Sequence, residues 1–277
     1  MTTQHEIEIV TGNRFAFGKN WERFLVELDD NSIELARQSL CDMLKIQDLQ
    51  RKGFLDIGSG SGLFSLVARR LGASVHSFDY DPHSVACTNE LKKRYFPEDT
   101  NWKVEQASVL DLKYLADLGK FDIVYSWGVL HHTGDMWQAL QNVSDLVRED
   151  GRLFIAIYND QGRSSRWWLV VKKVYDRLPS IFRYPLLLLM LLRLWGPTCI
   201  RELFAGRPFH TWRSYARVGQ RGMSPWRDVI DWVGGLPFEV AKPEQIFRFY
   251  NDRGFRLEEL KTCAGGLGCN EFVLRKC

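Results

Sequence analysis

Apolar residues in this chain gather in short runs that alternate with segments of helical spacing. The runs typical of strands cover residues 54–57, 74–79, 102–104, 121–125, 152–158, 256–262 and 271–275. Between the first two runs, apolar residues return at three- and four-residue intervals from Leu63 to Leu71, which places them on one face of a helix. This alternation of strands and helices predicts an α/β fold built on a parallel sheet.

The first predicted strand ends in a glycine-rich turn, FLDIGSGSG over residues 54–62. Glycine lacks a Cβ, so the chain can turn sharply and its backbone can approach a ligand closely. The helix that follows presents free N–H groups and the positive end of its dipole to the same ligand. A dinucleotide-binding oxidoreductase has the spacing G-x-G-x-x-G, whereas Gly58, Gly60 and Gly62 are spaced G-x-G-x-G. This spacing disfavours an oxidoreductase.

Two acids lie at the end of the second predicted strand. Asp79 ends that strand, where a carboxylate can accept hydrogen bonds from both hydroxyls of a ribose. Asp81 precedes Pro82, and this pair is typical of a helix start, because proline suits the first turn and an acid suits the N-terminus. We therefore predict that Asp79 contacts a nucleoside and that Asp81 caps a helix.

The glycine turn with Asp79, and the segment SWGVLHHTGD over residues 126–135, resemble motifs I and IV of the class I S-adenosylmethionine (SAM)-dependent methyltransferases. The resemblance covers about residues 52–160 and 243–277. Within the class the chain is similar to small-molecule O-methyltransferases of the ubiquinone-biosynthesis type. The resemblance implies a Rossmann-like, seven-stranded, mostly parallel sheet with helices on both faces, an N-terminal helical lid and a large helical insertion after strand five.

The resemblance also implies SAM as the cofactor. The residues expected to bind it are Trp21, Asp56, Gly58, Gly60, Gly62, Asp79, Tyr80, Ser108, Val109 and Ser126. After the third strand the family has a Gly-Asp pair that holds the adenine amino group, but this chain has Ala107 and Ser108. A serine hydroxyl accepts a hydrogen bond more weakly than a carboxylate does. The backbone N–H of Val109 would serve the adenine ring nitrogen, and Tyr80 would cover the ring.

The reaction implied is methyl transfer from SAM to a small-molecule acceptor, at oxygen. Because the acceptor oxygen must lose a proton, histidine is the natural general base near neutral pH. The candidates are His131 and His132 in motif IV and His210 in the insertion. The residues expected to bind the acceptor are Trp127, Tyr158, Asn159, Trp212, Arg213 and Tyr215. No spacing of His and Cys is typical of a metal site, so no metal is expected.

Residues 1–51 precede the first strand and carry two predicted helices. The first lies within residues 14–28, and the second runs from Ser32 to Leu44 with Asn31 or Ser32 as its N-cap. Two interpretations fit the segment. It either packs on the edge of the sheet or closes the cofactor pocket as a lid, with side chains from Phe17, Asn20 and Trp21.

Residues 161–242 interrupt the methyltransferase pattern and form a predicted insertion, separate from a core of residues 52–160 and 243–277. The insertion holds six of the ten tryptophans, and residues 161–222 contain twelve basic residues and two acidic ones. That stretch has a net charge of +10, so the remainder carries −7 of the total of +3. Three interpretations fit: a helical cap with a solvated basic face, a membrane-surface patch that collects a lipophilic acceptor, or recognition of an anionic acceptor.

The small total charge gives no case for nucleic-acid binding. An RNA methyltransferase that uses the basic insertion, and a non-catalytic SAM-binding protein at a membrane surface, are the alternatives to a small-molecule methyltransferase. The apolar stretch from Tyr184 to Leu192 is far shorter than the roughly 20 residues that span a bilayer. The N-terminus also lacks the pattern of a secretory signal. We therefore expect a cytoplasmic protein, with peripheral membrane contact if the insertion is a lipid-binding patch.

Overall fold

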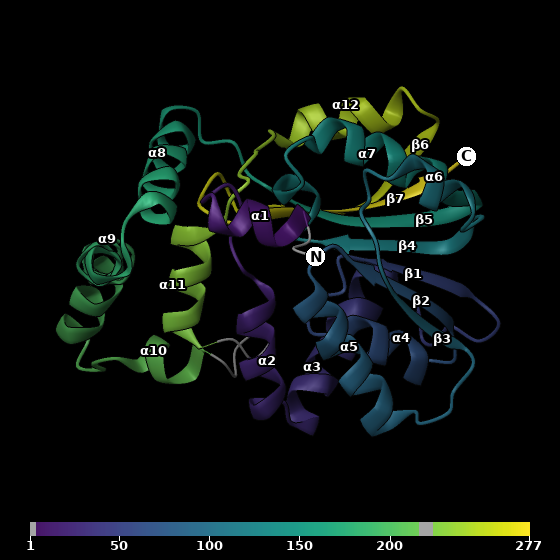
Figure 1. Ribbon diagram of the computed structural model, residues 1–277, viewed down its shortest axis with the longest axis horizontal. Coiled ribbons are helices and arrows are strands. Elements are labelled where there is room, and N and C mark those ends of the chain that lie inside the picture. Colours follow the sequence, from purple (N-terminus) through teal and green to yellow (C-terminus); the bar gives the residue numbers. More distant parts are fainter. Residues whose placement is uncertain (1–3, 216–223) are drawn as a thin grey trace.

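The computed structural model describes residues 4–215 and 224–277. Within these residues seven strands form one sheet in the order β3-β2-β1-β4-β5-β7-β6 (Figure 1). The strands are β1 (Gly53–Ile57), β2 (Ser74–Asp79), β3 (Trp102–Gln106), β4 (Phe121–Trp127), β5 (Val147–Tyr158), β6 (Phe255–Lys261) and β7 (Cys269–Lys276). The first five run parallel, and β7 is antiparallel to β5 and β6. The prediction of a Rossmann-like, mostly parallel seven-stranded sheet is confirmed.

Helices cover both faces of this sheet (Figure 1). One face carries α3 (Asp30–Leu44), α4 (Leu63–Arg70) and α5 (Pro82–Tyr95), and the other carries α6 (Leu112–Ala116), α7 (Met136–Asp145) and α12 (Pro243–Asn251). On the first face Leu40 and Trp102 are fully buried in the core. On the second face Ile155 and Tyr250 are buried in the same way. Because the central strands are covered on both faces, their sequences are almost continuously apolar.

Strand β1 lies between β2 and β4, so the chain reverses its direction across the sheet at this point. The three strands are parallel, and their carboxyl ends therefore meet at one edge. Gly58 follows β1, Asp79 ends β2 and Trp127 ends β4, which brings the predicted motifs together at that edge. Ligands of open α/β sheets bind at such a switch point.

Three helices precede β1: α1 (Gln4–Val10), α2 (Gly18–Glu27) and α3. Helix α2 packs against α5 and buries Phe24 and Leu25. Helix α1 was not predicted, because its seven residues are too few to establish a helical period. The N-cap predicted for α3 is wrong. Asp29 caps the helix, since its carboxylate accepts hydrogen bonds from both the backbone N–H and the hydroxyl of Ser32.

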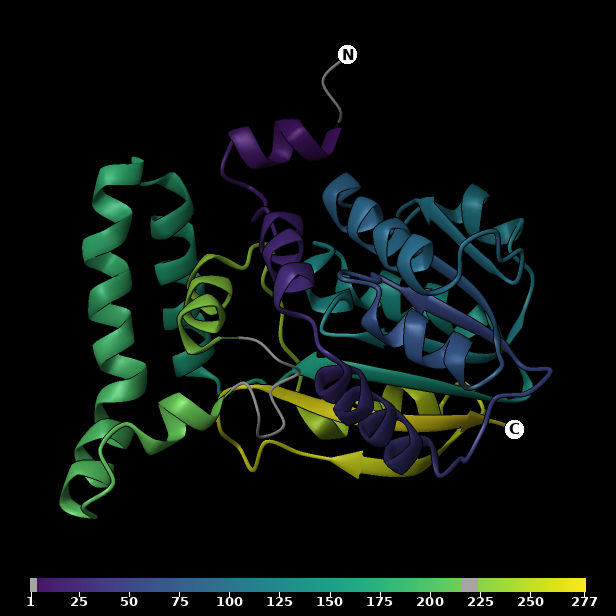
Figure 2. The same ribbon diagram turned by 90° about the horizontal axis from the view of Figure 1, so that it is seen from below.

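The described residues between β5 and α12 form the helices α8 (Arg163–Arg177), α9 (Ser180–Phe204), α10 (His210–Ser214) and α11 (Pro225–Gly234). Helix α11 packs against both α8 and α9, and Trp168, Met190 and Val233 meet in a core of their own. Helix α9 lies at the outer edge of the molecule in both views (Figures 1 and 2). Among the described helices, none is both long and apolar enough to cross a membrane. Two of the twelve basic residues, Arg217 and Arg221, lie outside the described residues.

Candidate active site

The turn between β1 and α4 is built from glycines that no other residue could replace without strain. Gly58 and Gly60 have φ angles of +74° and +56°, in the left-handed region that favours glycine. A side chain at Gly58 would overlap the methyl groups of Val129, and one at Gly60 would come within 3.1 Å of the Trp21 ring. The turn is therefore held close to the loop after β4 and to helix α2, and its backbone faces the cavity described below.

Asp79 lies beside this turn. One carboxylate oxygen accepts a hydrogen bond of 2.9 Å from the backbone N–H of Gly60, and the other accepts one of 2.9 Å from Asp81. Burial raises the pKa of Asp79 to about 6, although both N–H donors favour the charged form. The side chain lines the cavity, so its remaining lone pairs can accept hydrogen bonds from a ligand.

A large cavity of about 1290 Å³ runs from this edge of the sheet to the helices that follow β5. Among the residues predicted to bind the cofactor, its lining includes Trp21, Asp56, Gly58, Gly60, Asp79, Tyr80, Ser108 and Val109. Gly62 and Ser126 do not line it. Ser126 instead donates a hydrogen bond to the carbonyl of Ile57, which joins β4 to β1. A Cβ at Gly62 would lie 2.9 Å from Thr88, so this glycine lets α4 and α5 approach.

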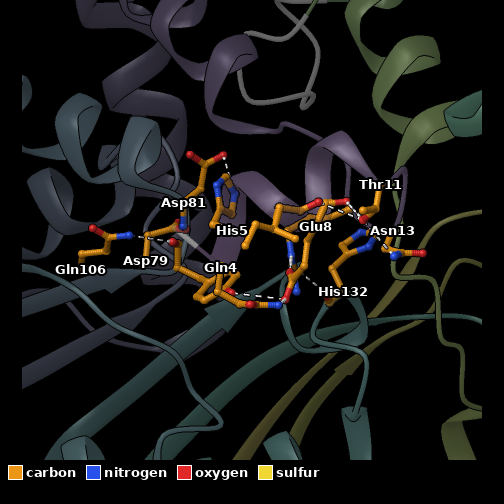
Figure 3. Close-up of polar contacts among 12 residues, drawn as sticks. Gln4, His5, Glu8, Thr11, Asn13, Asp79, Asp81, Gln106 and His132 are labelled. Atoms are coloured by element: carbon orange, nitrogen blue, oxygen red, sulfur yellow. Dashed lines mark hydrogen bonds and ion pairs between the residues drawn. The ribbon is translucent and has the colours of Figure 1, made fainter. Parts of the chain in front are cut away.

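Helix α1 contributes His5 and Glu8 to the cavity lining near Tyr80. Figure 3 shows these two side chains between Asp81 and His132. Arg14 donates a hydrogen bond of 2.6 Å to Glu8 and one of 3.1 Å to the carbonyl of His132. Its guanidinium carbon lies 4.8 Å from the centre of the Tyr80 ring, and the Tyr80 hydroxyl donates to Glu8. Arg14 therefore connects the N-terminal segment to both ends of the cavity.

Asp81 also holds the N-terminal segment in place. It caps α5 as predicted, because its carboxylate accepts a hydrogen bond from the backbone N–H of His83. It also accepts one of 2.8 Å from the N–H of Gly18, and His5 Nε2 lies 3.6 Å from it (Figure 3). Burial lowers the pKa of His5, so the ring is neutral near pH 7. The sequence could not indicate the roles of His5 and Arg14, since Asp81, Tyr80 and His132, which they contact across the cavity, are more than 60 residues away in the chain.

The two histidines of motif IV have different environments. His132 lines the cavity, and its Nδ1 lies 2.5 Å from the carbonyl of Pro237. A carbonyl can only accept, so Nδ1 carries the proton and Nε2 keeps a lone pair. His131 lies behind it, fully buried, with its ring 3.9 Å from that of Tyr158. Burial lowers the pKa of His132 to about 3 and holds the pKa of His131 well below its usual value, so both are neutral.

The far end of the cavity is lined from α9 and α11, by residues that include Trp195, Asp228 and Trp232. Tyr215 donates a hydrogen bond of 2.7 Å to Asp228. Behind this wall the fully buried Lys172 donates to the carbonyl of Trp232. Of the residues predicted to bind the acceptor, Trp127, Tyr158 and Tyr215 line the cavity.

The remaining candidates lie outside the cavity lining. Asn159 donates to the carbonyl of Gly266 and accepts a hydrogen bond from Asn270, so its amide holds the loop before β7. Trp212 packs 4.8 Å from Trp195, behind the wall. Arg213 and His210 are exposed on α10. Phe17 and Trp21 line the cavity, while the side chain of Asn20 lies outside what the structure describes. No group of potential metal ligands occurs within the described residues.

Comparison with known proteins gives a family match and several relatives. Residues 55–153 match a family model described as a methyltransferase domain. A ubiquinone biosynthesis O-methyltransferase of Glaesserella parasuis is 34% identical over 120 residues, which are 42% of this chain and 49% of that protein. A tRNA U34 carboxymethyltransferase of Ectopseudomonas mendocina is 30% identical over 140 residues, which are 50% of this chain and 42% of that protein. The chain thus spans about half the length of these relatives or less.

Among solved structures, magnesium protoporphyrin IX methyltransferase from Synechocystis PCC 6803, with bound S-adenosylhomocysteine, has a similar fold. The TM-score is 0.55 at 14% identity, over 99% of this chain and 100% of that one. At this identity the likeness concerns the fold alone. Together with the family match, it confirms the prediction of a class I SAM-dependent methyltransferase domain.

Proposed function

We propose that this chain, whose residues 55–153 match a methyltransferase domain, transfers a methyl group from SAM to an oxygen of a small-molecule acceptor. The observation that carries the proposal is the continuous cavity, which joins the glycine turn and Asp79 at one end to His132 and Trp232 at the other. Its volume of about 1290 Å³ exceeds the roughly 300–1,000 Å³ of a site for one small ligand. Two ligands can therefore meet inside it.

The first end of the cavity fits SAM. Asp79 offers a carboxylate to the ribose hydroxyls, and the Cβ-free turn at Gly58 and Gly60 offers open backbone to the amino-acid part. Ser108 accepts a hydrogen bond from the N–H of Leu110, and its hydroxyl keeps one lone pair and its proton for the adenine edge. This serine, in the place of the family's aspartate, supports cofactor binding by a weaker contact.

SAM supplies an electrophilic methyl group when bound, so the chain must mainly orient the acceptor, take its proton and exclude water. Phe17 and Trp21 close the cavity above the turn. His132 is the residue we assign as general base, because Nε2 keeps a lone pair and the ring lines the cavity. Burial lowers the pKa of His132 to about 3. The hydroxyl proton therefore passes to Nε2 only as the oxygen–methyl bond forms, because the oxygen then becomes positively charged and its proton far more acidic.

The lining of the far end favours a lipophilic, aromatic acceptor over an anionic one. Aromatic rings from Phe15, Tyr158, Trp195 and Trp232 contribute to its walls. Asp228 offers a carboxylate, which suits a second hydroxyl of the acceptor rather than a phosphate. None of the basic residues described in α8–α10 lines the cavity. The basic side chains described in α8–α10 therefore serve something other than the acceptor.

A transfer assay with methyl-labelled SAM tests the proposal. We expect label to pass to phenols or catechols with an apolar substituent, and not to RNA. His132→Ala should lower kcat by about 10²-fold or more, as loss of a general base does, while His210→Ala, an exposed histidine outside the cavity, should not. Transfer to RNA in preference to every phenol would favour the RNA methyltransferase alternative. Binding of SAM with no transfer to any acceptor would favour a non-catalytic SAM-binding protein.

A further inference from the structure

Helices α8 and α9 leave an unusually apolar face in contact with solvent. More than half of the large hydrophobic side chains that are exposed in the described residues lie between residues 167 and 209. On α9 the exposed fractions reach 73% for Ile181, 68% for Leu192 and 65% for Leu203. An exposed apolar surface of this kind is typical of a site that contacts another protein or a membrane.

Four of the exposed residues form a stripe along α9. Ile181, Leu188, Leu192 and Leu203 are separated by seven, four and eleven residues, which places all four on the same side of a helix. The opposite side of α9 carries Leu187 and Met190, which are buried against α11. The inner side of α9 therefore packs against the rest of the protein. Its outer side, which we call the α9 stripe, is apolar and contacts no other element among the described residues.

The exposed charged residues of α8–α10 have one sign. The exposed basic residues of α8–α10 are Arg163, Arg166, Lys173, Arg177, Arg193, Arg201 and Arg213, with Arg207 between α9 and α10. No salt bridge to any of them occurs within the described residues. The acids of the same helices are Asp176, which is partly buried, and Glu202, which is buried and accepts hydrogen bonds from Thr211. No exposed acid in α8–α10 offsets this positive charge.

We propose that the α9 stripe and the exposed basic residues of α8–α10 bind the surface of an anionic lipid bilayer. A helix with an apolar face and basic flanks lies in the interface, with its apolar side chains among the acyl chains and its cations at the anionic headgroups. A second copy of this chain fits less well, because a two-fold contact would place the same positive surfaces opposite each other. Single-stranded nucleic acid fits less well too, since the four side chains of the α9 stripe are aliphatic and offer bases no ring on which to stack, and the exposed rings of Phe182 and Phe204 lie outside the stripe.

The docked orientation would bring the cavity close to the lipid. Leu194, Trp195 and Thr198 of the same helix line the cavity. One helix, about 10 Å in diameter, therefore separates the α9 stripe from the acceptor end. Docking itself is independent of the proposed methyl transfer, and only this consequence, access for a lipophilic acceptor, rests on it.

Sedimentation of the full chain with vesicles tests the proposal. We expect binding to vesicles of phosphatidylcholine with about a third phosphatidylglycerol, none to phosphatidylcholine alone, and release as salt screens the charges. Ile181→Ser/Leu192→Ser should raise the lipid concentration for half-binding at least tenfold. Lys173→Glu/Arg193→Glu should do the same while leaving the apolar residues in place.

Two matched variants control for the loss of any exposed apolar or basic side chain. Leu112→Ser removes a leucine that is 61% exposed on α6, and Lys93→Glu/Lys120→Glu reverses two exposed charges away from α9. Both should bind vesicles as the wild type does. Calorimetric titration with SAM checks that every variant is folded, and it separates a failure of docking from a failure of the proposed enzyme.

Three results would overturn the proposal. The wild type could stay in the supernatant with anionic vesicles at low salt. It could bind both vesicle types equally, which would remove the role of charge. Light scattering could also show a dimer that Ile181→Ser/Leu192→Ser converts to a monomer, and a second copy would then be the partner.

Discussion

The close approach of Val129 to the glycine turn can be measured through Gly58→Ala. Gly58 has a φ angle of +74°, and the new methyl group would overlap the side chain of Val129. Gly119 offers a matched control, because its φ angle is +76° and nothing lies within 4 Å of the position that a Cβ would occupy. The two substitutions therefore share the backbone strain and differ in the overlap.

The structure allows the two contributions to be estimated. An alanine in the left-handed region costs about 1–2 kcal/mol, and this is the whole effect expected for Gly119→Ala. Adding a methyl group to a filled site costs about 1–3 kcal/mol more. Gly58→Ala should therefore lower the free energy of unfolding by about 2–5 kcal/mol in total.

Urea unfolding of both variants and of Gly58→Ala/Val129→Ala separates these contributions. The double variant should recover most of the overlap energy, which would appear as a coupling of about 0.5–3 kcal/mol between neighbouring sites. Equal destabilisation by Gly58→Ala and Gly119→Ala, with no coupling to Val129, would refute the reasoning. The glycine would then be needed only for its backbone angle.

Three further predictions concern charges around the cavity. Burial raises the pKa of Asp79 to about 6, so the affinity for SAM should decrease as the pH is lowered below about 6 and the carboxylate is protonated. Calorimetry should show a weaker pH dependence for Asp79→Asn. Burial lowers the pKa of Lys172 to about 7, below the roughly 10.4 of an unfolded chain. The unfolded state then binds more protons, so the free energy of unfolding should rise from about pH 7 to pH 10, and urea unfolding of Lys172→Met should lack this rise. Arg14→Ala should weaken SAM binding about two- to fivefold, because a partly exposed ion pair contributes up to about 1 kcal/mol. Limited proteolysis should also cut the variant within residues 4–17 faster than the wild type.

Sequence patterns predicted the sheet and its glycine turn well, because these depend on local periodicity and on backbone angles that few residues adopt. Asp81 was predicted as a cap from its position before Pro82 alone. The contacts of the N-terminal segment could not be predicted in this way. His5 and Arg14 reach the cavity only because the folded chain brings α1 against β2 and the loop after β4.

The direction in which the insertion's charges point could not be predicted either. Lys172 and Lys173 are adjacent in sequence, yet one is fully buried among aromatic rings and the other is exposed. The number of basic residues in the sequence therefore could not exclude an anionic acceptor. The packing of α8 and α9 on α11 directs the described basic residues of α8–α10 away from the cavity, which supports the lipophilic acceptor proposed above.

Calorimetric titration with SAM of the wild type and of Asp79→Ala tests the central claim most directly. We predict micromolar binding by the wild type and at least tenfold weaker binding by Asp79→Ala, about 1.4 kcal/mol. Asp111→Ala, which removes an exposed acid that caps α6, should bind SAM as the wild type does. The absence of SAM binding by the folded wild type, or equal binding by Asp79→Ala, would contradict the assignment of the glycine turn and Asp79 to the cofactor.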